Sequence, residues 1–463
     1  MLKKTLLALL ATTLLFSGIS AAPANAVTIK VVSAPTITKY AKVGSKVSAV
    51  AAKFNLKTTK TTWQWYFAGK AIPKATASTY VVKSTQKTGS LKVVQTAYIG
   101  STKKILTSNI IYVGRLWTSG KATLRYTDAN QSAVEVVLPE ILPAPASVSY
   151  SWLRDNFDIY SDGTKTRTIG LTDRGATLAA KIAIKAPAGY TDLTLLTADI
   201  EPASVTRTYE QVWSDEFSGS AGSTVNETYW HGENGTGSDQ GLRGWGNNER
   251  QYYKFENATQ DGNGILEIKA TTAGASDTNC YYGPCEWYLS RIATKGQVSF
   301  LYGRLEARIK GAPGLGTWGA FWTLGTDIDT ILWPWCGEID ITELVGKGPN
   351  NVLGYIHGPG GGSRGQTYDL GVDWSQDYHT YAVDWLPDQV VWYVDGQKFS
   401  VINREGKPWA YGKQHYILLN LAMGGNLGGS IDPDLKDAVM KVDYVRFSKI
   451  NGIGEIFFNA PLP

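Results

Sequence analysis

Short runs rich in Val, Thr and Tyr, separated by Gly and polar turn residues, recur along this chain. Thr61–Tyr66 and Thr79–Val82 are two such runs. From Tyr209 onward, Gly and Trp are dense, and no stretch there keeps a 3.6-residue apolar period with helix caps. Because alternating runs bury one face of a strand, the pattern predicts an all-β protein made of sandwiches.

The first residues, Met1–Ala26, have the composition of an export signal. Two lysines precede an apolar run from Leu6 to Phe16, and small residues end at Ala24-Asn25-Ala26. We interpret residues 1–26 as a signal peptide, so the mature protein is expected to be secreted and extracellular. No later stretch approaches about 18 apolar residues, which disfavours a membrane-embedded protein.

Charge is spread thinly over the chain, with a net charge of +5 and no block of Lys or Arg. This distribution disfavours a nucleic-acid partner. Charged residues are scarce while Trp, Tyr and Gly are abundant, a balance common in extracellular β-rich proteins that bind sugars on aromatic faces. We expect a monomer with a polysaccharide partner.

The 463 residues exceed one ordinary core, so several domains are expected. Residues 27–114 and 115–203 read as two copies of one small sandwich, because Trp65 precedes Leu91 by the same 26 residues that separate Trp152 from Leu178. Both Trp side chains are interpreted as core. The copies loosely resemble bacterial immunoglobulin-like modules, which implies spacers or weak binders of cell wall or polysaccharide.

The third region, residues 207–450, begins after the linker signal Glu201-Pro202-Ala203-Ser204. Alternation is clear in 301–310, and 390–401 reads as a hairpin with a type I′ turn at Asp395-Gly396. A jelly roll of two antiparallel sheets fits this length and pattern. Residues 451–463 are expected to be a C-terminal tail.

The three cysteines cannot hold the whole fold together. Cys280 and Cys285 bracket Tyr-Tyr-Gly-Pro, and a local disulfide is expected there in an exported protein, with reduced thiols as the alternative. Cys336 is then a packed thiol, since no neighbouring His could activate it.

The segment 335–344 places three acids in one predicted strand. By alternation, Cys336, Glu338 and Asp340 share one face while Ile339 and Ile341 point to the core. Regular alternation would bury Glu343 in that core, at a high cost. A one-residue β-bulge near Ile341 or Thr342 would return Glu343 to the acidic face.

An acidic edge strand would explain the charges, but the flanking Trp and Ile residues favour a covered central strand. Glycoside hydrolysis needs one ionised carboxylate and one held protonated by its surroundings. A retaining enzyme places the two about 5–5.5 Å apart. The acids therefore predict this chemistry, if the bulge forms.

The region Gln211 to Ser448 resembles glycoside hydrolase family 16, and within it the laminarinase-type endo-1,3-β-glucanases. The segments that carry the resemblance are Trp213-Ser-Asp-Glu-Phe217, Trp245-Gly-Asn-Asn-Glu-Arg-Gln-Tyr-Tyr253, Arg291-Ile-Ala-Thr-Lys-Gly296, Tyr302-Gly-Arg-Leu-Glu-Ala-Arg-Ile-Lys310, Trp333-Pro-Trp-Cys-Gly-Glu-Ile-Asp-Ile-Thr-Glu343, His357-Gly-Pro-Gly360 and Val442-Asp-Tyr-Val-Arg446. The resemblance implies a concanavalin-like jelly roll and a secreted β-glucanase.

By the family motif E-x-D-x-x-E, Glu338 looks like the nucleophile, Glu343 the general acid/base and Asp340 the carboxylate that orients or tunes the nucleophile. The longer spacing resembles the 1,3-glucanases more than the lichenases. Agarases and carrageenases share it, and the segment Trp-Gly-Asn-Asn-Glu favours a laminarin-like substrate over theirs. Mixed-linkage glucan and galactan stay open.

The resemblance also implies substrate-binding positions. They are Trp245, Asn247, Arg291, Trp318, Trp322, Trp333 and His357. Trp318 and Trp322 share a strand face, although such pairs are more often core. The resemblance is the only support for a site role of His357, and a structural His is the alternative.

No metal-ligand spacing links the four histidines, so no catalytic zinc and no cofactor for catalysis are expected. Family members often bind a structural Ca²⁺, and the motif match makes Asp443 a candidate ligand, with a solvated strand Asp as the alternative.

Three functions fit this sequence: a hydrolase, a non-catalytic glucan-binding protein on the same fold, and a transglycosylase. The presence of both glutamates favours catalysis over binding alone. Hydrolysis and transfer would use the same residues and differ in whether water or sugar accepts the glycosyl unit.

Overall fold

The computed structural model describes residues 28–359, 362–405 and 408–458, so the expected signal peptide lies outside the described residues. Strands dominate, and the α-helices are single turns, α1 (Ile328–Ile331) and α2 (Gly425–Gly428). No helix in these three ranges is long and apolar enough to cross a membrane. The all-β class predicted from alternation is confirmed.

The chain divides into two compact units. The first contains the described residues up to Gly120 together with Pro139–Val148 and Ile184–Leu193. The second contains Lys121–Leu138, Ser149–Ala183 and everything from Thr194 on. The boundary therefore runs through the region predicted as a second small sandwich.

The N-terminal strands form small sheets around Trp65. One sheet pairs β2 (Thr36–Ile37), β3 (Lys46–Val50) and β7 (Thr79–Val81), and another contains β5 (Lys60–Phe67), β6 (Lys70–Ala71), β8 (Gly89–Ile99), β9 (Thr102–Thr107) and β10 (Ile111–Val113). Trp65 is fully buried, stacks on Tyr80 at 5.6 Å between ring centroids, and donates from Nε1 to the Ala77 carbonyl. It is a core residue, as predicted.

The next strands repeat this arrangement. One sheet pairs β12 (Thr123–Tyr126), β13 (Ala133–Val137) and β17 (Thr166–Thr168), and another pairs β16 (Phe157–Ile159), β15 (Ser147–Arg154), β18 (Leu178–Lys185) and β19 (Leu193–Leu196). Trp152 is buried and donates to the carbonyl of Thr164, twelve residues on, as Trp65 does to Ala77. The two Trp side chains thus make the same contact, and the internal repeat stays a prediction.

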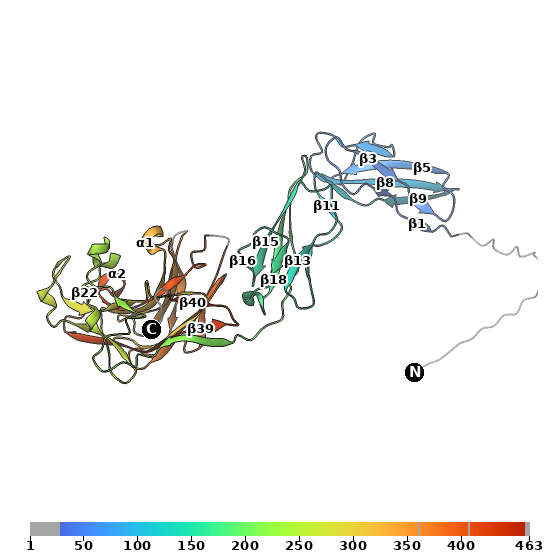
Figure 1. Ribbon diagram of the computed structural model, residues 1–463. Coiled ribbons are helices and arrows are strands. Elements are labelled where there is room, and N and C mark those ends of the chain that lie inside the picture. The colour runs from blue at the N-terminus through green and yellow to red at the C-terminus, as the bar shows by residue number, and fades with distance from the viewer. Residues whose placement is uncertain (1–27, 360–361, 406–407, 459–463) are drawn as a thin grey trace, which may run out of the picture. The chain divides into compact units, whose positions relative to one another are not determined.

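Two large sheets build the C-terminal domain (Figure 1). The ten-stranded sheet runs β22 (Gln251–Tyr253), β27 (Trp287–Leu289), β24 (Leu266–Thr271), β39 (Asp437–Ile450), β30 (Gly303–Lys310), β35 (His379–Leu386), β36 (Gln389–Val394) and β37 (Gln397–Asn403), with β20 (Tyr209–Asp215) on β39 and β23 (Ala258–Gln260) on β24. The nine-stranded sheet runs β21 (His231–Gly232), β28 (Arg291–Ala293), β38 (His415–Met423), β31 (Thr317–Gly325), β32 (Glu338–Val345), β33 (Asn351–His357) and β34 (Ser363–Asp369), with β29 (Val298–Leu301) and β40 (Glu455–Phe458) alongside.

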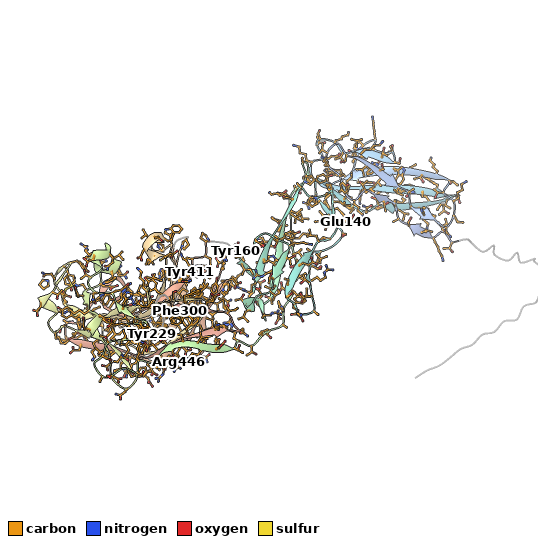
Figure 2. The ribbon with its side chains drawn as sticks, in the orientation of Figure 1. Glu140, Tyr160, Tyr229, Phe300, Tyr411 and Arg446 are labelled. Atoms are coloured by element: carbon orange, nitrogen blue, oxygen red, sulfur yellow. A yellow bond between two sulfur atoms is a disulfide. The ribbon has the colours of Figure 1, made fainter. Side chains whose placement is uncertain are left out.

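Apolar side chains from both sheets fill one continuous core, in which Phe300 is fully buried (Figure 2). Ile339 and Ile341 of β32 belong to this core, together with Leu305 of β30 and Val383 of β35. Each inner face contributes every second residue, which is the packing expected of two stacked sheets. The other face of the nine-stranded sheet is thereby left for polar groups.

One local prediction for this domain is confirmed, and two others differ from the structure. The predicted hairpin is confirmed, because Asp395 and Gly396 both have positive φ, 48° and 75°, as a type I′ turn requires. Tyr302, with φ 60°, interrupts the single strand expected over 301–310. Residues 455–458, expected to lie in a C-terminal tail, instead form β40, which pairs with β29.

Candidate active site

The acidic segment forms β32, a central strand between β31 and β33. Its pairing contains the expected bulge. Asp340 pairs with Tyr355 and Glu343 pairs with Leu353, so the two residues between Asp340 and Glu343 lie opposite the single residue Gly354. The same shift appears against β31, where Phe321 pairs with Thr342 and Trp322 with Asp340. The extra residue lies at 341 or 342, where the parity argument required it.

The bulge is held from inside the core. The Asp340 carbonyl accepts a hydrogen bond of 2.8 Å from Trp392 Nε1, whose strand belongs to the opposite sheet. Trp392 is fully buried, and a Cβ on Gly354 would lie 2.5 Å from its ring. Glycine is therefore needed on β33 to admit the indole that satisfies this buried carbonyl.

Each glutamate of the strand accepts a hydrogen bond from an indole. Trp333 Nε1 donates to Glu338 Oε2 at 2.9 Å, and Trp318 Nε1 donates to Glu343 Oε1 at 3.1 Å. Trp333 is 54% exposed, so its ring is available for stacking as well. The structure thus brings two predicted aromatic residues directly to the two predicted catalytic acids.

His357 joins the same cluster from β33. Its Nε2 lies 3.0 Å from Asp340 Oδ2 and 3.7 Å from Glu338 Oε1, and Ser363 lies 3.0 Å from its Nδ1. Among the described residues, Glu338, Asp340 and His357 are the one group of three potential ligand side chains whose donor atoms lie within 4.8 Å of one another. The imidazole is placed to orient Asp340 and to face Glu338.

Burial and mutual repulsion change the acidity of the three carboxyl groups. Burial and the charge of Asp340 raise the pKa of Glu338 to about 8. Burial and the charge of Glu338 raise the pKa of Glu343 to about 7. Burial and the charge of Glu343 raise the pKa of Asp340 well above its usual value. At neutral pH the cluster therefore retains protons, as an acid/base pair requires.

A second cluster of predicted binding residues surrounds Arg291. Its guanidinium carbon lies 4.4 Å from the Trp245 ring centroid and 4.9 Å from that of Trp322, and Glu233 forms an ion pair with it. Cation–π contacts on two rings fix their orientation. Trp322 is half-buried on the same strand face as Trp318, as parity predicted.

Residues that the sequence analysis missed support this second cluster. Trp322 Nε1 donates to Asn420 Oδ1 at 2.7 Å, Asn420 Nδ2 donates to the Tyr253 hydroxyl at 3.2 Å, and Tyr253 donates to Glu249 at 3.0 Å. Burial raises the pKa of Glu249. The sequence feature that could have identified this support is Asn420, a lone amide side chain in the apolar run Tyr416–Met423.

The remaining predicted site residues contact groups other than the three carboxylates. Asn247 Nδ2 bonds to Glu249 at 3.1 Å, which ties it to the support of the Arg291 cluster. Cys280 and Cys285 form a disulfide, and Cys336 is a buried free thiol. Burial raises the pKa of Cys336 to about 11, so it is not a nucleophile at neutral pH.

Asp443, the candidate calcium ligand, lies on β39 in an ion pair. Its Oδ2 is 2.6 Å from Arg308 Nη1. Ca²⁺ takes six to eight oxygen ligands, and a guanidinium contributes none. The surroundings of Asp443 thus show an ion pair with Arg308, and the calcium site stays a prediction.

This two-sheet domain places buried carboxyl groups with raised pKa values beside indole rings. Together with the family match, this site defines the class of carbohydrate-cleaving enzymes called glycoside hydrolases. The family description "Glycosyl hydrolases family 16" matches residues 246–446. The chain belongs to this family.

Similar proteins share the C-terminal half of the chain. Glucan endo-1,3-beta-glucosidase A1 of Niallia circulans is 36% identical over 263 residues, which are 51% of this chain and 37% of that protein. Beta-glucanase of Rhodothermus marinus is 34% identical over 258 residues, 51% of this chain and 84% of that protein. The solved endo-beta-1,3-glucanase of Pyrococcus furiosus is 40% identical, covering 52% of this chain and 95% of that chain with a TM-score of 0.49.

Proposed function

We propose that the C-terminal domain is a retaining, endo-acting hydrolase of 1,3-β-glucosidic bonds, with Glu338 as nucleophile and Glu343 as general acid/base. The observation that carries the proposal is the bulge of β32, which turns Glu343 to the face of Glu338. Relatives named glucan endo-1,3-beta-glucosidase and beta-glucanase support the substrate class. The chain covers 37% of the first of these and 84% of the second.

In the first step Glu343 protonates the glycosidic oxygen while Glu338 attacks the anomeric carbon, so the bond to the leaving sugar breaks and a glycosyl–enzyme ester forms. In the second step Glu343, now ionised, removes a proton from water, which attacks the same carbon and releases Glu338. Both steps need Glu343 to exchange a proton near neutral pH, and its raised pKa of about 7 suits that role.

Glu338 must be ionised to act as the nucleophile, and burial together with the charge of Asp340 opposes this by raising its pKa to about 8. The indole N–H of Trp333 and the nearby imidazole of His357 both favour its ionised form. Asp340, which touches the same imidazole, orients and tunes the nucleophile. The exposed ring of Trp333 can stack on a pyranose beside the reacting bond.

The products formed from laminarin test this function. Short oligosaccharides with new reducing ends support a hydrolase, unchanged polymer would indicate glucan binding alone, and oligosaccharides longer than those supplied would indicate transfer. Initial rates on laminarin, lichenan, curdlan and agarose separate the linkages. A galactan preference is the alternative, since a keratan-sulfate endo-1,4-beta-galactosidase of Sphingobacterium multivorum is 28% identical over 257 residues.

We further propose that the protein is an exported monomer and that the N-terminal sandwiches act as spacers or weak polysaccharide binders. The composition of residues 1–26 supports export, and the burial of Trp65 and Trp152 supports the spacer role, since neither ring is free for sugar. Co-sedimentation with insoluble glucan is the test, comparing the Glu338→Gln protein with and without residues 27–114. Equal binding supports spacers, and a loss on truncation would indicate binding modules.

A further inference from the structure

Arg154, at the end of β15, carries a buried charge that its own sandwich does not fully neutralise. The side chain is 1% exposed. Its Nη1 donates to Asp173 at 3.2 Å and to Asp388 at 3.0 Å, and its Nη2 donates to Asn403 at 2.7 Å. Asp388 and Asn403 belong to the catalytic domain, 234 and 249 residues further along the chain.

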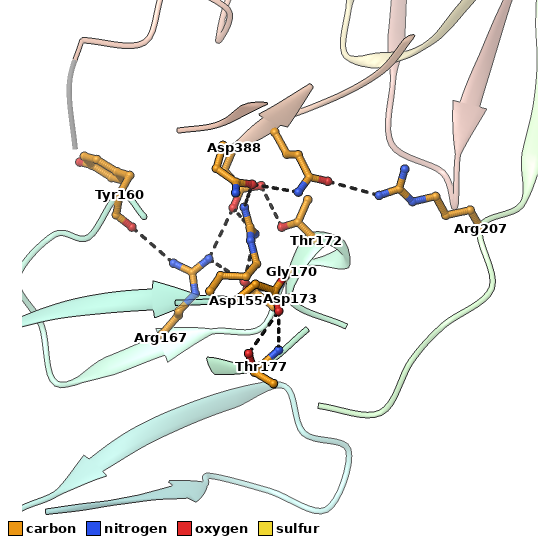
Figure 3. A network of polar contacts seen from close by, with 12 residues as sticks. Asp155, Tyr160, Arg167, Gly170, Thr172, Asp173, Thr177, Arg207 and Asp388 are labelled. Atoms are coloured by element: carbon orange, nitrogen blue, oxygen red, sulfur yellow. Dashed lines mark hydrogen bonds and ion pairs between the residues drawn. The ribbon is translucent and has the colours of Figure 1, made fainter. Parts of the chain in front are cut away.

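Arg167 and Thr172 point to the same carboxylate of Asp388 (Figure 3). Arg167 Nη2 lies 2.9 Å from Asp173 and 3.4 Å from Asp388, and the Thr172 hydroxyl donates to Asp388 at 2.9 Å. The cluster thus holds two guanidinium groups and two carboxylates. Its charges balance only while Asp388 is in place, because Asp173 alone faces both arginines.

Further contacts at the edge of this charged cluster join the second sandwich to the catalytic domain. The Tyr160 amide donates to the Arg404 carbonyl at 2.8 Å, and the Arg404 guanidinium carbon lies 3.8 Å from the Tyr160 ring centroid. On the catalytic side, Gln389 Nε2 donates to Asn403 at 2.9 Å, and Arg207 Nη2 donates to Gln389 at 3.3 Å. One chain of polar contacts therefore runs from Tyr160 and Arg154 to the segment that enters the catalytic domain.

We propose that the turn around Asp388 is a docking surface for segment Ser149–Ala183, and that this part of the second sandwich is a fixed part of the catalytic unit. Its partner is defined by chemistry: the buried guanidinium group of Arg154 and the half-buried guanidinium group of Arg167, which need a second carboxylate. A buried mixed-charge cluster specifies one arrangement, because any other leaves charge unpaired and out of water. The spacer role proposed above then applies to the sandwich around Trp65.

The docking surface is separate from the catalytic strand. Asp388 lies in the turn between β35 and β36 of the ten-stranded sheet, whereas β32 belongs to the nine-stranded sheet. Among the residues that the structure describes, the side-chain hydrogen bonds of Asp388 go to Arg154, Arg167 and Thr172, and none goes to the carboxyl groups of β32. Loss of docking should therefore change local protection without changing turnover.

Hydrogen–deuterium exchange on the full-length protein tests this proposal. The amide of Tyr160 is the reporter, since it is bonded to Arg404 only when the segment is docked. In the wild type its exchange should be slow. Asp388→Asn keeps the shape but removes the charge, and should speed exchange at Tyr160 by about tenfold or more. Asp158→Asn, an exposed carboxylate on β16, is the matched control and should leave it unchanged.

A second variant and an activity measurement complete the test. Tyr160→Ala removes the ring over Arg404 without entering the buried cluster, and should speed exchange at the backbone amide of residue 160 even if Asp388→Asn fails to fold. Rates on laminarin should match the wild type in both variants, which separates this proposal from the catalytic one. Fast exchange at Tyr160 in the wild type, or slow exchange there in folded Asp388→Asn, would overturn the proposal.

Discussion

At the scale of single residues, the site is a set of acids whose charges are restrained by burial and by one another. Glu338 and Glu343 each have one indole donor, and their pKa values are raised to about 8 and about 7. The proton that Glu343 needs for catalysis is therefore present near neutral pH. The repulsion between the carboxylates, which helps to keep this proton on Glu343, also destabilises the fold.

Replacing either glutamate by Gln keeps the shape and removes the chemistry. Glu338→Gln should abolish turnover on laminarin, because an amide cannot form the ester intermediate. Glu343→Gln should lower kcat by roughly 10²–10⁴-fold, the usual contribution of a general acid/base. Initial rates on folded protein, checked by circular dichroism, measure both effects. Near-native turnover in either variant would show that the roles are misassigned.

Glu343→Gln should also stabilise the fold at alkaline pH. Because the folded-state pKa of Glu343 is raised above its unfolded value of about 4.5, the folded state binds more protons between these two values, and stability falls as pH rises through them. Above about pH 7 the variant should gain roughly 1–3 kcal/mol in free energy of unfolding. At pH 4, where both forms are neutral, the gain should vanish.

Urea denaturation at pH 4 and pH 8 measures this difference. Glu267→Gln is a control in the opposite direction. Burial alone would raise the pKa of Glu267, but the hydrogen bonds and charges of Lys441 and Lys269 together outweigh burial and lower this pKa. A Glu343→Gln protein that is no more stable than the wild type at pH 8 would contradict the account of the acidic face.

At the scale of elements, the bulge of β32 is the feature on which the site depends. The Trp392 indole and the space left by Gly354 hold it from the core, so the position of Glu343 is set by packing behind the strand. On the other side of β31, β38 supplies Asn420, through which Trp322 is tied to Tyr253. The indole of Trp322, a proposed substrate-binding ring, is thus positioned by the buried amide of Asn420.

Asn420→Ala should release Trp322 and weaken substrate binding. We expect kcat/KM on laminarin oligosaccharides to fall by about tenfold, mainly through KM, because the reacting carboxylates are not touched. Thr323→Val is the matched control, since it removes a buried hydrogen bond to His415 without releasing the indole of Trp322. If both variants lose stability equally and neither changes KM, Asn420 has only a structural role.

The ion pair between Arg308 of β30 and Asp443 of β39 bears on whether calcium stabilises the protein. With Arg308 on Asp443, removal of divalent ions by EDTA should leave the melting temperature unchanged. A marked drop, restored by Ca²⁺, would show that a cation site exists despite this contact. Differential scanning calorimetry at equal ionic strength distinguishes the outcomes.

At the scale of the whole molecule, alternation and turn chemistry predicted the all-β class, the hairpin at Asp395-Gly396 and the bulge, because each depends on local periodicity. The parity of β32 even assigned Ile339 and Ile341 to the core. What the sequence could not predict depends on pairs distant along the chain. Trp392 under Asp340, Asn420 beside Trp322 and Asp388 against Arg154 each join strands that only the topology brings together.

The central claim concerns the whole catalytic cycle, in which two inversions at one carbon give net retention. Proton NMR of a short laminarin digestion reads the anomer of the first reducing ends, before mutarotation mixes them. We expect the β-anomer to form first. First appearance of the α-anomer would mean direct attack by water and would contradict the assignment of Glu338 as nucleophile.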